Sequence, residues 1–216
     1  MTTVTEIIGR VNTQLIDPLM VRWPLSELCD YYNDAVRAVI LARPDAGASL
    51  ETLNCVPGSR QTLPEGAIQL LDVICLSDGG AMKPLPREVL DAQYPDWQTQ
   101  KGIPECFICS DLYPREFWLF PAPEEAISID AVISRIPETV NILTQDDVTP
   151  VPLEEAWVNP LVDWMLFRAF SKDIAGGAVQ GLAAQHYQSF IQQLGIKQGA
   201  DDALSVRKKI FNGGGV

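Results

Sequence analysis

The stretch "FWLFPAPEEAISIDAVISRIP", Phe117–Pro137, decides the fold at the centre of this 216-residue chain. Apolar residues alternate with mostly polar ones along Ile127–Ile136, which predicts a strand with one buried face. That face is expected to carry Ile127, Ile129, Ala131 and Ile133. Glu116–Phe120 indicates a second, apolar strand. "FPAPEE" separates the two, and its prolines cannot donate to a β-ladder. The stretch predicts two strands of a sheet joined by an acidic turn, and it holds no catalytic pattern.

Prolines and glycines cut the rest of residues 48–150 into short pieces, which favours strands and turns. "SDGGAM" (Ser77–Met82) predicts a hairpin turn, because glycine supplies the positive φ that such turns need. Short helical pieces are expected at Leu63–Leu70 and Arg87–Tyr94. Further strands are expected near Leu50–Val56, Leu71–Leu76 and Cys106–Cys109.

Helical periodicity marks both ends of the chain. Thr3 and Glu6 have the spacing of a capping box at the start of the first helix. Pro160 lies inside the third helix and is expected to kink it. The four predicted helices cover residues 4–16, 24–43, 152–174 and 178–194.

These patterns predict an α+β fold. The N- and C-terminal helix pairs, residues 1–47 and 151–196, are expected to form a four-helix bundle. Residues 48–150 are expected to form an inserted antiparallel β-rich unit. Residues 197–216 are expected to form a flexible C-terminal arm.

The charge of the chain is strongly negative and unevenly placed. It has 28 acidic and 16 basic residues, a net charge of −12, which disfavours ordinary nucleic-acid binding by the body of the protein. The last ten residues contain no acid and hold Arg207, Lys208 and Lys209. Ile210 and Phe211 supply apolar anchors beside these cations. The tail is therefore interpreted either as a solvent-exposed end or as a segment that folds when it binds a partner.

Several features place the chain in a reducing, aqueous compartment. "MTTVTEIIGR" lacks the basic start and apolar core of a signal peptide. The most apolar run, Leu161–Phe170, is too short to span a bilayer. Five cysteines without a framework spacing favour free thiols. We expect synthesis and folding in the cytoplasm and no membrane partner.

No catalytic, metal-binding or cofactor-binding site is predicted. Cys106 and Cys109 spell CxxC, but there is no second pair, and His186 is the only histidine. The residues around these two cysteines predict a β-strand, so we expect both cysteines to have a structural role. His186 is expected to be a helix-surface or interface residue. Neighbouring carboxylates such as Glu124-Glu125 point in different directions and do not predict a hydrolase pair.

Aromatic residues give two readings for Trp97 and Trp118. Both could pack in the core of the chain. Both could instead fill pockets between subunits, since aromatic residues dominate interface energetics.

The order of segments resembles the head-to-tail adaptor (connector) proteins of tailed bacteriophages. The resemblance runs from Val4 to Gly195 and rests on the succession of pieces rather than on one motif. The pieces are "WPLSELCDYYNDAVRAVILARPDA", "LPEGAIQLLDV", "PDWQTQKGIPECF", "REFWLFPAP", "EEAWVNPLVDWMLFRAFSKD" and "HYQSFIQQLG".

The resemblance implies a structural virion protein at the neck of the particle, not an enzyme. Members of this family form a ring, commonly of twelve copies, between the portal and the tail or nozzle. Viral DNA passes through such a ring during ejection without specific binding. A C-terminal arm reaches the portal, and residues 197–216 hold that position, with residues 207–211 as its docking part. The alternative is a monomeric assembly or binding module that engages one partner through its tail.

Overall fold

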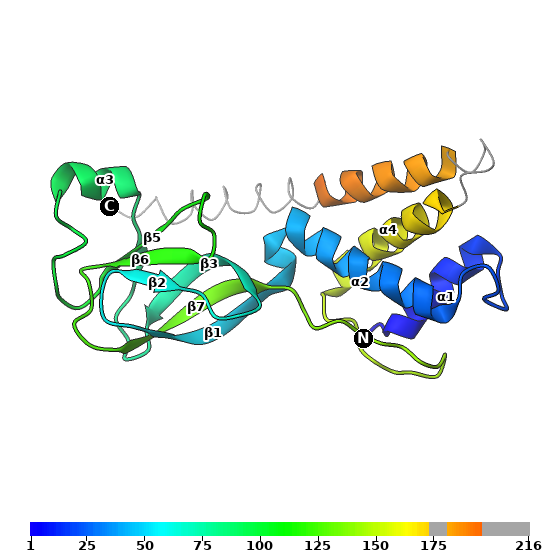
Figure 1. Ribbon diagram of the computed structural model, residues 1–216, viewed down its shortest axis with the longest axis horizontal. Helices are drawn as coiled ribbons and strands as arrows, with labels where there is room; N and C mark the ends of the chain where they lie inside the picture. Colours follow the sequence, from blue (N-terminus) through cyan, green and yellow to red (C-terminus); the bar gives the residue numbers. More distant parts are fainter. Residues whose placement is uncertain (173–180, 196–216) are drawn as a thin grey trace, which may run out of the picture. The chain divides into compact units, whose positions relative to one another are not determined.

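The structure, a computed structural model, describes residues 1–172 and 181–195 (Figure 1). The described part is a mixed α+β fold, as expected. Contacts within the chain cluster into two units. We call Met1–Arg43 together with Glu138–Val216 unit 1, and Pro44–Pro137 unit 2. The predicted domain bounds, residues 1–47 with 151–196 for the helical bundle, residues 48–150 for the β-rich insert and residues 197–216 for the arm, stay predictions.

The first helix of unit 1, α1 (Val4–Leu15), begins with the predicted capping box. The Glu6 N–H donates to Thr3 Oγ1 at 3.2 Å, and the Thr3 N–H donates to Glu6 Oε2 at 2.8 Å. These bonds satisfy donors that a helix start leaves open. Ile16 ends the helix with a φ of 55°. The apolar stripe of α1 is buried along its length: Val4, Ile7, Ile8, Val11 and Leu15.

Two longer helices complete the centre of unit 1. The second, α2 (Leu25–Ala42), follows Pro24, and α4 (Val158–Ser171) follows the short 3-10 turn η2 (Glu155–Trp157). The third helix therefore begins later than predicted. Pro160 lies in its first turn, where the missing N–H costs no hydrogen bond, so the expected kink inside the helix is wrong. The helices α1, α2 and α4 pack against one another.

The last described helix covers residues 181–195. It packs on α4, where the rings of Trp164 and Phe190 lie 4.9 Å apart and Phe190 is 2% exposed. The predicted start of this helix, residues 178–180, lies outside the described residues. Closure of all four helices around one core stays a prediction.

Unit 2 contains two sheets (Figure 1). The first is antiparallel, with the order β1-β7-β3. The second has the order β2-β6-β5-β4, and only its β4-β5 pair is parallel. The elements are η1 (Pro44–Gly47), β1 (Ala48–Cys55), β2 (Arg60–Thr62), β3 (Ala67–Leu76), β4 (Lys83–Pro84), α3 (Arg87–Gln93), β5 (Cys106–Cys109), β6 (Glu116–Phe120) and β7 (Ile127–Arg135).

One buried apolar cluster contains residues of both sheets. Phe117 and Leu119 from β6 lie in the same cluster as Ile129, Ala131 and Ile133 from β7. The predicted buried face of β7 is therefore confirmed from Ile129 onward, and Ile127 packs partly buried at the edge of the cluster. The two sheets share one core.

Two expectations for unit 2 are wrong. The strands β6 and β7 lie in different sheets, so the acidic turn between them carries the chain from one sheet to the other. The helical piece expected at Leu63–Leu70 is a turn followed by the start of β3. The other short helical piece, near Arg87–Tyr94, is confirmed as α3.

The predicted hairpin turn after β3 is confirmed. Gly79 has a φ of 107°, and the Leu76 N–H donates to the Gly80 carbonyl at 2.7 Å. A residue with a side chain would be strained at Gly79. Across residues 1–172 and 181–195, the helices are too short or too polar to cross a membrane.

Candidate functional site

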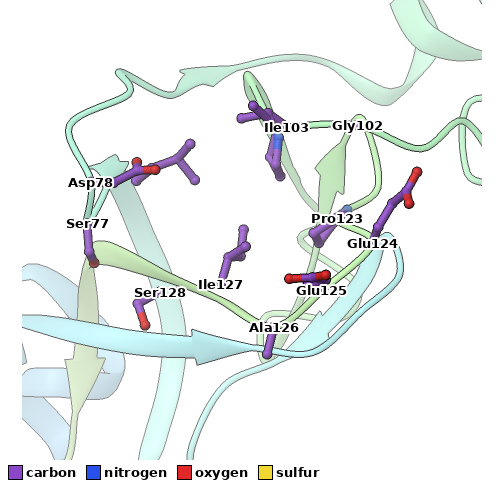
Figure 2. Close-up of a pocket in the computed structure, with 12 residues that line it drawn as sticks. Ser77, Asp78, Gly102, Ile103, Pro123, Glu124, Glu125, Ala126, Ile127 and Ser128 are labelled. Carbon is purple, nitrogen blue, oxygen red and sulfur yellow. The ribbon is translucent and has the colours of Figure 1, made fainter.

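A cavity of about 680 Å³ opens in unit 2 (Figure 2). Three segments that are distant in the sequence line it: residues 76–78 at the end of β3, residues 102–104 before β5, and residues 123–128 before and at the start of β7. We call it the unit 2 cavity.

Backbone hydrogen bonds hold its three walls in place. The Ser77 N–H donates to the Ser128 carbonyl at 2.9 Å, which joins the first wall to the third. The Gly102 N–H donates to the Ala122 carbonyl at 3.0 Å, which joins the second wall to the segment after β6. The third wall is fixed further by the Gly58 N–H, which donates to the Pro123 carbonyl at 2.9 Å. These backbone hydrogen bonds fix the positions of the cavity walls within unit 2.

The floor and one wall of the cavity are apolar. Ile103 projects from the second wall and is 76% exposed, an unusual degree of exposure for isoleucine. Ile127 is half-buried across from it, and Pro104 and Pro123 are buried residues of the lining. Figure 2 shows Ile103, Pro123 and Ile127 around the hollow. An apolar side chain entering the cavity would find apolar contacts on more than one side.

The rim of the cavity is acidic. Asp78 lies on one side, and Glu124 and Glu125 lie on the other (Figure 2). All three side chains are exposed, and within the described ranges none has a cation at ion-pair distance. Among the residues that the structure describes, no lysine or arginine lines the cavity. Within this part of the chain, the negative charge of the rim is not neutralised.

The lining has no catalytic arrangement. Its two hydroxyls are engaged in structure: Ser128 Oγ donates to Asn54 Oδ1 at 2.9 Å, and Ser77 Oγ donates to Asp130 Oδ1 at 3.2 Å. The described residues that line it include no histidine or cysteine. Over the part of the chain that the structure describes, no group of three or more histidine, cysteine and acidic side chains could hold a metal ion. The cavity is suited to binding an apolar group with cationic neighbours.

The structure places the two predicted interface aromatics differently. Trp97 is 2% exposed, packs with Leu90 and Ile108, and donates from Nε1 to Asp91 Oδ1 at 2.8 Å. It has little surface left for a neighbouring chain. Trp118 is half-buried and lines a second, more polar hollow of about 660 Å³. An interface role for this pair stays a prediction, and Trp118 is better placed for it.

The hollow beside Trp118 has its own charged pair. Arg60 Nη2 lies 2.5 Å from Glu116 Oε1, and the bond joins neighbouring strands β2 and β6. This pair is satisfied within the chain. The hollow therefore offers less free charge than the unit 2 cavity.

The two cysteines of the CxxC motif lie on β5, as predicted, and both thiols are free. His186 is not a lone surface residue. Its Nδ1 lies 2.7 Å from Asp163 Oδ1 on α4, and Ser189 Oγ donates to Asp163 Oδ2 at 2.7 Å. Because the serine bonds the acid rather than the histidine, the three do not form a catalytic triad.

The cationic and apolar residues of the predicted docking arm lie outside the described residues: Arg207, Lys208, Lys209, Ile210 and Phe211. The unit 2 cavity itself was not predicted from the sequence. Its walls come from three separate segments, and only the isolated Ile103 between Gly102 and Pro104 gives a local sign of an exposed apolar residue.

Comparison with known protein families gives a match over most of the chain. The family model described as SU10 adaptor protein matches residues 2–208, which spans both units. A search of curated proteins finds no match.

Proposed function

The chain belongs to the SU10 adaptor protein family, a family of phage head-to-tail adaptors, and we propose that it forms a ring between the portal and the tail or nozzle of the particle. Membership makes it a structural protein of the virion and not an enzyme. The match over residues 2–208 carries this proposal. The ring, its contacts and its passage for DNA are the proposed parts.

Exposed apolar residues support a role in contacts between chains. The loop between α1 and α2 exposes Ile16, Leu19 and Val21 to 77% or more. Leu143 and Val148 in the segment before η2 are each 79% exposed. Single exposed apolar residues are ordinary, but three in one short loop favour a role of that loop in contacts between chains. A closed ring needs two different complementary surfaces on each subunit, and this loop surface supplies one of them.

The negative charge of the chain supports a conduit for DNA. A net charge of −12 per subunit, multiplied around a ring, would repel a polyanion from the wall and let it slide. The proposal concerns the inner wall alone. A ring whose inner wall carries a basic net charge would contradict it.

The arm is proposed to attach the ring to the portal. Residues 197–216 follow the last described helix, and residues 207–211 combine three cations with two apolar anchors. Such a segment can gain affinity by ordering on a partner surface. Twelve copies are proposed, from the family resemblance.

The test is assembly with the portal. The full-length protein is mixed with purified portal, and the mass of the complex is measured together with its image by electron microscopy. We expect a ring on the portal, even if the free protein is a monomer, since a ring can close only on its partner. Failure to bind any portal would instead favour a monomeric assembly module.

A second measurement tests whether the arm binds the portal. Deleting residues 197–216 should leave the circular dichroism and melting of the helices unchanged and weaken portal binding. The variant Leu19→Ser in the loop surface should keep portal binding by the arm and weaken contacts between subunits. A truncated protein that docks with undiminished affinity would remove the arm from the proposal.

A further inference from the structure

We propose that the unit 2 cavity is a docking site for residues 206–211 of this chain, "VRKKIF". The inference goes beyond the adaptor role, because it assigns a second place to a segment proposed above to contact the portal. The two sites would then compete for the same segment. It requires no ring and can be tested on the protein alone.

The volume and lining of the cavity suit large apolar side chains. Its volume of about 680 Å³ lies within the range of about 300–1,000 Å³ that is typical of ligand pockets. Ile103, Ile127 and Pro123 provide its apolar surface (Figure 2). Residues 210 and 211, an isoleucine and a phenylalanine, are matching occupants.

The charges are complementary in number and in placement. Asp78, Glu124 and Glu125 stand at the rim, where the flanks of a bound segment would lie. Immediately before the two apolar residues, the segment has an arginine and two lysines. This is the one place in the sequence where basic residues follow one another directly. A chain with 28 acidic residues thus holds a single concentrated cationic patch, and the cavity holds acids that no cation in the described ranges neutralises.

Ten residues, 196–205, separate the segment from the last described helix, and an extended chain of that length spans up to about 35 Å. A connection of this length allows the segment to bind at a site away from the end of the helix over residues 181–195.

The experiment uses the full chain with its own segment disabled. In the variant Arg207→Glu/Lys208→Glu/Lys209→Glu the tail can no longer neutralise the rim. A synthetic peptide of residues 203–213 is titrated into this protein, and the isoleucine methyl groups are followed by NMR. We expect saturable shifts of the Ile103 and Ile127 methyl signals, and no shift of Ile142, which is buried in unit 1.

Two matched pairs of substitutions, each made in this tail-disabled chain, separate a specific site from general attraction. Glu124→Lys/Glu125→Lys should weaken peptide binding at least tenfold. Glu65→Lys/Glu88→Lys changes the net charge equally at exposed positions of unit 2 that do not line the cavity, and it should leave binding within about twofold. All four positions are exposed, so both variants should melt like their parent.

A third comparison tests the apolar contacts. A peptide with serine at positions 210 and 211 should bind at least tenfold more weakly than the native peptide. The wild-type chain, whose own segment occupies the cavity, should bind the native peptide more weakly than the tail variant. Equal losses in the two charge variants, or no shift at Ile103, would overturn the proposal. Portal binding is measured separately, so the adaptor role can stand if this site fails.

Discussion

Replacing Asp163 by alanine should loosen the helix over residues 181–195 from α4. Asp163 Oδ1 lies 2.7 Å from His186 Nδ1, and its Oδ2 accepts hydrogen bonds from Ser189 and Gln193. A carboxylate only accepts, so His186 carries its proton on Nδ1. The side chain of Asp163 is 13% exposed and that of His186 is 20% exposed. Alanine would leave three donors with only partial access to water.

The size of the effect follows from these bonds. A hydrogen bond to a charged group contributes about 1.5–3 kcal/mol when it is well shielded. Because water reaches part of this cluster and can replace some of the bonds, about 1 kcal/mol for each is the expected net loss. The total is a loss of about 3 kcal/mol in the free energy of unfolding of the 216-residue protein, or roughly 6–12 °C in its melting temperature.

Tryptophan fluorescence during urea unfolding measures this loss, because the Trp164 ring lies 4.9 Å from Phe190 at the same contact. The control is Asn159→Ala, an exposed position on α4, which should change the free energy of unfolding by less than about 0.5 kcal/mol. If Asp163→Ala unfolds at the same urea concentration as the control, apolar packing of Phe190 alone holds the helix. The reasoning from the carboxylate would then be refuted.

Three further predictions concern unit 2. Arg135 donates to both carboxylate oxygens of Glu51, at 2.6 and 2.8 Å, and these bonds lower the pKa of Glu51 below its usual 4.5. Because the pKa is lowered in the folded state, the stabilisation is complete above about pH 4.5 and is lost as the pH falls further. The difference in free energy of unfolding between wild type and Glu51→Gln, measured by urea titration, should therefore become smaller in acid. A difference that does not change with pH would contradict this. Burial raises the pKa of the Cys55 thiol to about 11, so a thiol reagent should label Cys55 only after unfolding, and stoichiometric labelling of Cys55 in the native protein would show otherwise. Leu119 is fully buried, so Leu119→Ala should lower the free energy of unfolding of unit 2 by about 2–5 kcal/mol in a urea titration, and a loss below about 1 kcal/mol would mean that the core collapses around the gap.

Local signals in the sequence predicted the start and the apolar stripe of the first helix. The capping box of Thr3 and Glu6 needs only residues three apart, and the apolar stripe of α1 repeats at helical spacing. Both depend on neighbours along the chain. Such features can be read without knowing what the helix packs against.

The strand β3 shows why local spacing also misled. Its buried residues Ala67, Leu70, Val73 and Leu76 are three apart, a spacing closer to a helix than to a strand. The register with β7 shifts at three points, between Ala67 and Gln69, between Leu70 and Asp72, and between Val73 and Cys75. Each irregularity adds a residue and turns the strand, so the inward face recurs every third position. Only the partner strand reveals these irregularities.

The sheet to which β6 and β7 each belong, and the unit 2 cavity, could not be predicted from the sequence for a similar reason. The two strands of Phe117–Pro137 are close in sequence, yet β6 pairs with β2 and β5 whereas β7 pairs with β1 and β3. The cavity needs three segments to meet, and no one of them carries a binding motif. Both results depend on long-range pairing, which composition and periodicity do not encode locally.

The way unit 2 joins the chain bears on how an adaptor can vary. Ala48, near the start of unit 2, is the register partner of Ser134, near its end, in the antiparallel β1-β7 pair. Opposite residues in such a pair have Cα atoms about 4.5–5.5 Å apart. Ser134 Oγ also donates to the Pro44 carbonyl at 2.7 Å, which fixes the first residue of the unit beside its last strand. The two ends of unit 2, where it connects to unit 1, therefore lie next to each other. Changes in loops of unit 2 that are far from these ends need not move the ends apart. The walls of the unit 2 cavity are such loops, so the residues of the proposed docking site can change while the helices keep their packing.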